Sequence, residues 1–264
     1  MPELPEAETI VRTLAPHIEG RRLEAMEIRS ARAAPEPLPD LAGRTVERVR
    51  RYGKQVVWDL DGGLLRFELR MTGLLLWRVE PGPYTRVRLR FCGAAVCFDD
   101  IRQFGSLRWS AGELPRLGPD ALEIEAADLA RRLAGRRARI KPLLTDQRFL
   151  RGLGNIYADE ILHRARVHPM TPAHRLGGAR ARRLHAAMRE VLTEAIALGG
   201  SSISDYVDAD GRPGRFQERH RVYGREGAPC PACGARIRRI VVGGRGTWLC
   251  PRCQRLPRGV SGRV

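Results

Sequence analysis

Apolar residues recur every fourth position near the start of the chain. Ile10, Leu14 and Ile18 form one stripe on the helix that this spacing predicts. The preceding stretch, residues 2–8, contains two prolines and three glutamates. Proline is tolerated in a first helical turn, and carboxylates are favoured at the positive end of the helix dipole. The pattern therefore predicts an N-terminal helix with Pro2 in its first turn.

Polar and apolar residues alternate over much of the following hundred residues, and this period is typical of β-strands. The alternation occupies three stretches, each containing or following a glycine turn: 44–60, 64–77 and 85–98. Short strands at this spacing indicate a β-sandwich or barrel. Cys92 and Cys97 fall on the last of the three. Isolated thiols in strands are most often small buried hydrophobes, so we assign these two cysteines no function.

From residue 126 onward the periodicity becomes helical, and it predicts helices over 128–133, 140–146, 156–165 and 179–198. A glycine-rich turn, residues 152–155, precedes the third helix. A helix N-terminus after such a turn is suited to bind a phosphate, although the turn alone is more often structural. Residues 199–216 then lack periodicity. A loop of this length in a compact domain is either functional or disordered.

The chain is strongly basic, with 47 lysines and arginines against 30 acidic residues and a formal net charge of +17. This excess favours a polyanionic partner, of which nucleic acid is the default candidate, although a ribosomal protein or arginine-rich coding bias gives the same balance. Lys54 and Lys141 are the only lysines. Because lysine and arginine differ in shape, hydration and proton chemistry, both positions are candidates for specific roles.

The sequence predicts neither a membrane segment nor an exported protein. No apolar run approaches the roughly 18 residues of a transmembrane span. The N-terminal stretch is too acidic and too poor in apolar residues to be a signal peptide. We therefore expect a cytoplasmic protein.

Two Cys-x2-Cys pairs near the C-terminus are separated by 16 residues: Cys230, Cys233, Cys250 and Cys253. Pairs at this separation are typical of a four-thiolate zinc site, which is closed and structural. Two disulfides are the alternative, but a cytosolic chain keeps its thiols reduced. Glycines at 243–246 predict a hairpin tip between the pairs, and this tip presents Arg245.

The N-terminus offers a possible nucleophile. Removal of Met1 would leave Pro2 with a free α-nitrogen. An α-amine has a pKa near 8, against about 10.4 for lysine, so more of it is neutral at pH 7. A neutral amine attacks carbonyl-like carbons and forms Schiff bases. The same residues are also consistent with a well-started helix and nothing more.

Several short stretches, spread over nearly the whole chain, resemble the bacterial formamidopyrimidine-DNA glycosylase family, which excises oxidised purines such as 8-oxoguanine. The matching stretches are residues 2–6, 53–54, 70–73, 102–105, 152–158 and 222–227, together with the four cysteines. The resemblance implies an α+β fold: a β-sandwich with a leading helix over 1–120, a helix-two-turns-helix domain over 121–224 and a β-hairpin zinc finger over 225–264. It also implies a monomer that binds duplex DNA in the cleft between its domains.

The resemblance further implies a bifunctional glycosylase and abasic-site lyase. The Pro2 nitrogen would attack C1′ of the damaged nucleotide, Glu3 would act as the acid–base group, and Glu6 would contact the sugar or a water. The resulting iminium would allow β- and then δ-elimination. A nucleotide must leave the duplex for this chemistry, at a cost of a few kcal/mol. Other matched residues are the wedge that fills its place (Met71, Arg102, Phe104), the phosphate contacts (Lys54, Asn155, Arg245) and the lesion-capping loop 200–217 (Ser201, Tyr206).

One residue departs from the family pattern. The family usually has a histidine three residues before the wedge methionine, where this chain has Glu68. A carboxylate cannot donate to a phosphate and repels it, and Arg70 is the nearest compensating group. Two alternatives to a purine glycosylase remain at this point: a glycosylase for oxidised pyrimidines, and a non-catalytic binder of damaged or bent DNA. Retention of Met1 would favour the binder, because an acylated Pro2 nitrogen cannot attack.

Overall fold

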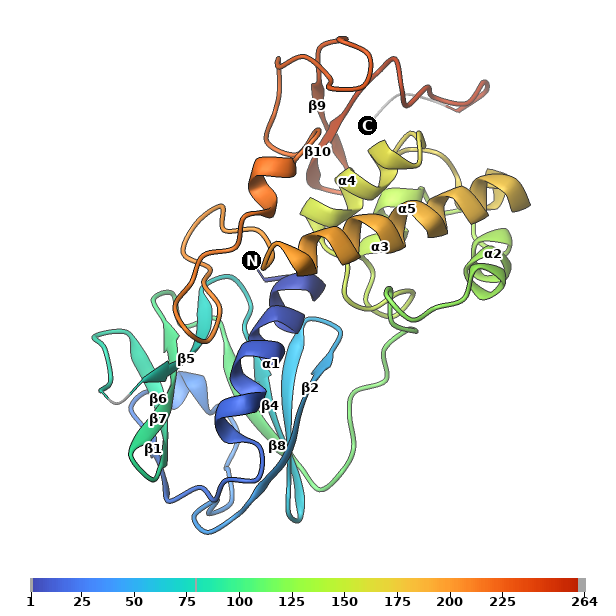
Figure 1. Ribbon diagram of the computed structural model, residues 1–264. Coiled ribbons are helices and arrows are strands. Elements are labelled where there is room, and N and C mark those ends of the chain that lie inside the picture. The colour runs from blue at the N-terminus through green and yellow to red at the C-terminus, as the bar shows by residue number, and fades with distance from the viewer. Residues whose placement is uncertain (1, 79, 261–264) are drawn as a thin grey trace. The chain divides into compact units, whose positions relative to one another are not determined.

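The computed structural model describes residues 2–78 and 80–260 of the chain. They form two compact units, each made of two segments. Unit 1 consists of Met1–Pro115 and Ala195–Gln217, and unit 2 consists of Arg116–Glu194 and Glu218–Val264. The chain therefore leaves unit 1, builds most of unit 2, returns for one loop and ends in unit 2 (Figure 1).

The leading helix, α1, spans Leu4–Ile18 and not the residues from Pro2 onward. Glu3 is its N-cap in an extended conformation, and Pro5, not Pro2, occupies the first turn. The predicted stripe is confirmed, because Ile10, Leu14 and Ile18 are fully buried against the sandwich core. Burial of this stripe fixes the helix beside the strands and so fixes where its N-terminus lies (Figure 1).

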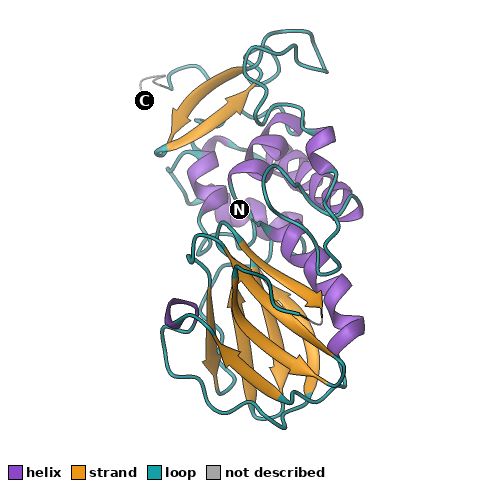
Figure 2. Cartoon of the chain, turned by 90° about the vertical axis from the view of Figure 1, so that its left-hand side faces the viewer, coloured by secondary structure: helices purple, strands orange, loops and turns teal. Residues whose placement is uncertain are grey.

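Unit 1 is a sandwich of two antiparallel four-stranded sheets (Figure 2). One sheet has the order β2-β3-β4-β8, with strands Val46–Tyr52, Gln55–Leu60, Gly63–Glu68 and Ser106–Ser110. The other has the order β1-β6-β7-β5, with strands Ala25–Ile28, Thr85–Phe91, Ala94–Asp100 and Gly73–Arg78. A short 3-10 helix, η1, spans Ala31–Ala33. Strands β1 and β8, which are short, were not predicted.

The stretch 64–77 forms two short strands, β4 and β5, which belong to different sheets. The chain crosses between the sheets through residues 69–72, where Arg70 has a φ of 51°. Gly73 closes the crossing: its amide donates to the Leu69 carbonyl at 2.9 Å. A Cβ on Gly73 would lie 2.5 Å from that same oxygen. The crossover therefore requires a glycine and places an exposed loop at the sheet edge.

Large aromatic side chains from both sheets fill the sandwich. Trp58 lies 4.9 Å from Phe67 and 6.2 Å from Phe91 between ring centroids, and Phe67 lies 6.2 Å from Phe98. All four are buried. Cys97 is buried as expected, whereas Cys92 is exposed because it begins the turn between β6 and β7. The sandwich thus has the continuous core that a rigid platform requires.

Unit 2 is helical with a two-stranded finger. Its helices are α2 (Ala126–Ala134), α3 (Ile140–Thr145), α4 (Asn155–Arg164) and α5 (Gly178–Ala197), the last turn of which belongs to unit 1. Two 3-10 helices, η2 and η3, span Ala173–Arg175 and Phe216–Arg219. Strands β9 (Arg238–Val242) and β10 (Arg245–Leu249) form the finger hairpin. The predicted α+β organisation is confirmed.

None of the helices in the described part of the chain combines the length and apolar character needed to cross a membrane.

Candidate active site and nucleic-acid interface

The N-terminal end of α1 gathers the candidate catalytic carboxylates. Glu3 and Glu6 are almost completely buried, and Pro2 beside them is also buried. A buried carboxylate is unfavourable unless it is hydrogen-bonded. Glu6 meets this requirement through two backbone donors: the Glu3 amide at 2.8 Å and the Ser201 amide at 2.7 Å. Glu6 therefore holds the start of the helix and the loop 200–217 together.

The loop 200–217 packs on α1 along several turns. The Tyr206 hydroxyl donates to the Glu6 carbonyl at 3.3 Å, and the Ala209 amide donates to Thr13 Oγ1 at 3.1 Å. Gly200 has a φ of 81°, and a Cβ there would lie 2.8 Å from Glu6 Oε1. Burial and the Glu6 charge raise the pKa of Tyr206, so its hydroxyl stays neutral. Tyr206 belongs to the sandwich core, and the irregular loop is thereby anchored.

Met71, Arg102 and Phe104 come together although they lie on two loops: Met71 on the first, and Arg102 and Phe104 on the second. Arg102 Nη1 lies 3.4 Å from Met71 Sδ, and the Arg102 guanidinium lies 4.5 Å from the centroid of the Phe104 ring. Met71 and Phe104 are exposed by 44% and 52%. Single exposed apolar side chains are common, but neighbouring ones that form a cluster are typical of an interaction surface.

Asp100 joins the two loops, and sequence reasoning missed it. It is almost completely buried at the end of β7. Its carboxylate accepts the Thr72 hydroxyl from the first loop and the amides of Arg102 and Gly105 from the second, the latter at 3.2 and 2.7 Å. The sequence signal was available, because Asp100 lies only two residues before the matched stretch 102–105. It was not informative until the neighbouring strands were known.

Lys54 lies in the two-residue turn between β2 and β3, where Tyr52 pairs with Gln55 and Gly53 has a φ of 64°. The predicted turn is confirmed. Nearby, Glu68 accepts hydrogen bonds from Gln55 Nε2 at 3.3 Å and from Arg70 Nη2 at 2.7 Å. The Arg70 side chain is 60% exposed, against 13% for Glu68. The carboxylate is therefore neutralised by an arginine that itself reaches solvent.

In unit 2, Asn155 and Arg245 are neighbours. Asn155 begins α4 after the predicted glycine turn, and its Nδ2 donates to the Gly246 carbonyl at 3.0 Å. Arg245 is exposed at the first position of β10, next to Gly246. Gly243 and Gly244, both with positive φ, form the tight turn before it. The predicted hairpin tip is confirmed.

The second lysine is the reason why this arrangement is rigid. Lys141 is fully buried, and its Nζ lies 2.8 Å from Asp159 Oδ1. The ammonium also donates to the Gly246 carbonyl at 3.0 Å and to Thr247 Oγ1 at 2.8 Å. The Asp159 carboxylate accepts the Trp248 amide at 3.0 Å. Buried charges persist only when paired and hydrogen-bonded, so these contacts tie α3 and α4 to the finger hairpin.

The four cysteines of the finger fit one zinc ion. Their sulfur atoms all lie within 4.8 Å of one another, and two of the separations are 3.4 and 4.0 Å. Tetrahedral zinc with bonds of about 2.3 Å to sulfur requires separations of this size. The four thiolates leave no coordination position for water, so the ion is structural. Its site holds the two chain segments that flank β9 and β10.

Comparison with known proteins agrees with this geometry. Three family descriptions match consecutive parts of the chain: the formamidopyrimidine-DNA glycosylase N-terminal domain at residues 1–107, the H2TH domain of the same proteins at 117–207, and the zinc finger found in FPG and IleRS at 227–256. A formamidopyrimidine-DNA glycosylase from Solibacter usitatus is 49% identical over 97% of this chain and 100% of its own length. This chain belongs to the formamidopyrimidine-DNA glycosylase family.

Solved structures support the same assignment. The crystal structure of MutM (Fpg) from Thermus thermophilus superimposes with a TM-score of 0.88 at 45% identity and covers 96% of this chain and 98% of its own. A complex of wild-type Lactococcus lactis Fpg with DNA containing N7-benzyl-Fapy-dG gives a TM-score of 0.89 at 32% identity, covering 97% and 100%. The fold and the family predicted from the sequence motifs are therefore confirmed, as is the four-cysteine zinc site.

Proposed function

We propose that this protein is a DNA repair glycosylase with abasic-site lyase activity, acting on duplex DNA that contains oxidised purines. The observation that carries the proposal is the group formed by Pro2, Glu3 and Glu6 at the start of α1, in a chain of this family. Glu6 fixes the helix start through the Glu3 amide, so the backbone that carries Pro2 and Glu3 is held in place at the end of α1. A neutral α-amine next to a fixed carboxylate is suited to covalent catalysis at a sugar carbon.

The reaction follows from these groups. The Pro2 nitrogen adds to C1′ while the bond from C1′ to the base breaks, and the departing base takes up the proton that the nitrogen loses. Glu3, the acid–base group, then donates a proton to the ring oxygen as the bond from C1′ to that oxygen breaks and the sugar ring opens. The product is an iminium ion, which acidifies the C2′ proton. Loss of that proton expels the 3′ phosphate by β-elimination, and δ-elimination then expels the 5′ phosphate. Hydrolysis of the Schiff base would return the free amine.

The remaining candidate residues would hold the DNA. Met71, Arg102 and Phe104 would enter the space left by the extruded nucleotide, which their exposure permits. Lys54, Asn155 and Arg245 would contact phosphates, which position DNA without reading its sequence. Ser201 and Tyr206, both buried, would hold the loop 200–217 on Glu6, and a flipped base would meet this loop. Arg70, paired with Glu68, would supply the phosphate contact that a carboxylate cannot make.

Partner and location follow the same reasoning. The net charge of +17 suits a DNA partner. A repair enzyme of this kind would act as a cytoplasmic, nucleoid-associated monomer. A boundary near residue 120 between the sandwich and the helical domain, and another near 225 before the finger, would divide the chain into its functional parts.

Covalent trapping tests the proposal. Borohydride added to the protein and an 8-oxoguanine duplex should give an adduct joined through the Pro2 nitrogen, located by peptide mass mapping. Pro2→Gly should retain some trapping because a primary α-amine remains, whereas Glu3→Gln should bind DNA and lose excision. An adduct mapped to Lys54, or none from a protein shown to lack Met1, would refute the assignment. The second outcome would leave a DNA binder without catalysis.

A further inference from the structure

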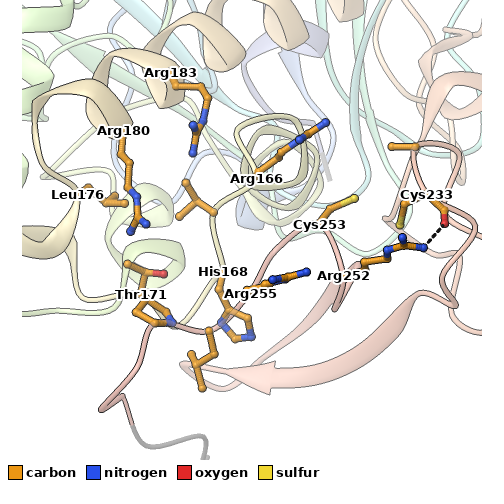
Figure 3. Close-up of a pocket in the computed structure, with 14 residues that line it drawn as sticks. Arg166, His168, Thr171, Leu176, Arg180, Arg183, Cys233, Arg252, Cys253 and Arg255 are labelled. Carbon is orange, nitrogen blue, oxygen red and sulfur yellow. Dashed lines mark hydrogen bonds between the residues drawn. The ribbon is translucent and has the colours of Figure 1, made fainter.

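Unit 2 contains a second basic site. A cavity of about 500 Å³ lies between the turn after α4, the start of α5 and the C-terminal end of the zinc finger (Figure 3). Five arginines line it: Arg166, Arg180, Arg183, Arg252 and Arg255. Its lining contains no aspartate or glutamate and shares no residue with the pair Asn155 and Arg245. It is therefore distinct from the phosphate contacts proposed above.

The charge of these arginines is uncompensated. In residues 2–78 and 80–260, no carboxylate lies within ion-pair distance of any of the five. Arg164, only two residues before Arg166, shows the contrast, because it pairs with Glu190 at 3.0 Å and with Glu194 at 3.2 Å. A guanidinium group without a carboxylate partner in a concave site attracts anions from solution.

Two of the guanidinium groups are oriented by the backbone. Arg183 Nε donates to the Ala165 carbonyl at 2.8 Å, and Arg252 Nη1 donates to the Cys233 carbonyl at 3.5 Å, the bond drawn in Figure 3. Each bond uses one of the five N–H donors of an arginine and leaves the others for a ligand. The two arginines come from opposite walls of the cavity, α5 and the finger.

His168, in the turn after α4, adds a neutral hydrogen-bond donor to the lining of the cavity. Its Nδ1 accepts the Met170 amide at 3.1 Å, so the proton of the neutral ring resides on Nε2. Burial lowers the pKa of His168 to about 4, which keeps the ring uncharged at neutral pH. The positive charge of the cavity therefore comes from the arginines alone.

We propose that this cavity binds two neighbouring phosphate groups, either those of a free diphosphate or those of successive nucleotides in a nucleic-acid strand. Guanidinium forks bind phosphate oxygens bidentately and carry a permanent charge. Arg180 and Arg183 project from one wall and Arg252 and Arg255 from the other, so two phosphates can be bound at once (Figure 3). A single carboxylate would leave most of this charge unneutralised.

The first test compares Arg180→Ala with Arg182→Ala. Both arginines are exposed on α5 and both substitutions remove one charge, but only Arg180 lines the cavity. Calorimetric titration of the zinc-loaded protein with inorganic pyrophosphate, with zinc content measured afterwards, should show affinity about tenfold weaker for Arg180→Ala, as expected for a lost charge-assisted hydrogen bond. Arg182→Ala should bind like the wild type. Any pyrophosphate that binds near Arg245 should do so equally in both variants, so it does not contribute to the difference in affinity between them.

A second experiment identifies the source of the phosphates. Salt dependence of binding is measured on a short duplex that covers only a lesion and on a duplex several helical turns longer. If the ligand is nucleic acid, Arg180→Ala should lower the slope of log affinity against log salt by about one unit on the longer duplex only. If Arg180→Ala weakens only the binding of pyrophosphate and leaves DNA binding unchanged, the ligand of the cavity is a free diphosphate. Equal behaviour of the two variants in both experiments would overturn the proposal.

Discussion

The sandwich of unit 1 and the finger of unit 2 hold functional side chains rigid in different ways. Among the described residues, the sandwich cluster contains 23 buried residues, most of them from α1, both sheets and the loop 200–217. The finger cluster contains four, Val222, Cys230, Ile237 and Cys250, of which two are zinc ligands. A core of four residues cannot offset the conformational entropy of ordering the finger. Ions must do so: the zinc site, and the buried pair of Lys141 and Asp159.

This difference indicates which kind of substitution should destabilise each unit. Loss of one apolar group in a large core leaves most of the packing intact. Loss of one charge from a buried ion pair leaves its partner uncompensated, and loss of the metal removes the cross-link among the four finger cysteines. The candidate DNA contacts Asn155 and Arg245 depend on the ion pair and the zinc site. Met71 and Phe104 depend on the apolar core of the sandwich.

Removal of zinc should have the largest effect. Four thiolates contribute on the order of 10 kcal/mol or more of binding free energy to such a finger. Chelation, or the Cys250→Ala substitution, should therefore unfold the finger while the sandwich keeps its own thermal transition. DNA affinity should fall because Arg245 loses its support. Unchanged DNA affinity in protein shown to be free of metal would contradict this prediction.

Breaking the buried ion pair between Lys141 and Asp159 should have the second-largest effect. Burial raises the pKa of Asp159 to about 7 even beside Lys141. In Lys141→Met the carboxyl loses its partner and must either stay buried as an unpaired charge or take up a proton, which should lower the free energy of unfolding of unit 2 by about 3–5 kcal/mol. The matched control is the double variant Lys141→Met with Asp159→Leu, which should recover much of that loss. Chemical denaturation of the three proteins measures both steps. A single variant as stable as the wild type would show that the pair does not support the hairpin.

Acid should weaken unit 2 through His168. Burial holds the folded-state pKa of His168 near 4, below its ordinary value of 6.5, so protonation favours the unfolded chain. Its contribution is complete above pH 6.5 and is lost as the pH falls toward 4. Partial exposure limits the effect to about 1 kcal/mol. Stability measured against pH should fall more steeply for the wild type than for His168→Asn, which keeps an acceptor for the Met170 amide but does not titrate. If the two curves of stability against pH were parallel, His168 would not contribute to the loss of stability in acid.

The smallest stability change is expected for the exposed wedge. Met71→Ala should alter the free energy of unfolding by less than about 0.5 kcal/mol, because the side chain is 44% exposed. The same substitution should slow excision from duplex DNA more than cleavage of a ready-made abasic site, where no base must be extruded. Single-turnover rates on both substrates measure the difference. A large loss of stability would instead assign Met71 to the core.

Local patterns predicted most elements correctly, because helix and strand periods are properties of short stretches. The stripe of Ile10, Leu14 and Ile18 identified α1, and the glycines near residue 243 identified the finger turn. Strand pairing is non-local, and the patterns did not specify it. The two strands in 64–77 lie next to each other along the chain, yet the crossover at Gly73 sends them to different sheets. No period within a stretch encodes the sheet that it joins.

The two lysines show what only the tertiary structure decided. Their rarity among 47 basic residues singled both out, but the sequence did not distinguish their roles. Lys54 is half-buried in the turn between β2 and β3, whereas Lys141 is fully buried against Asp159. In the same way, the cysteine spacing alone determined the zinc site, since its ligands are close along the chain. The cavity of five arginines was invisible in the sequence, because its walls come from segments up to 89 residues apart (Arg166 to Arg255) that only folding brings together.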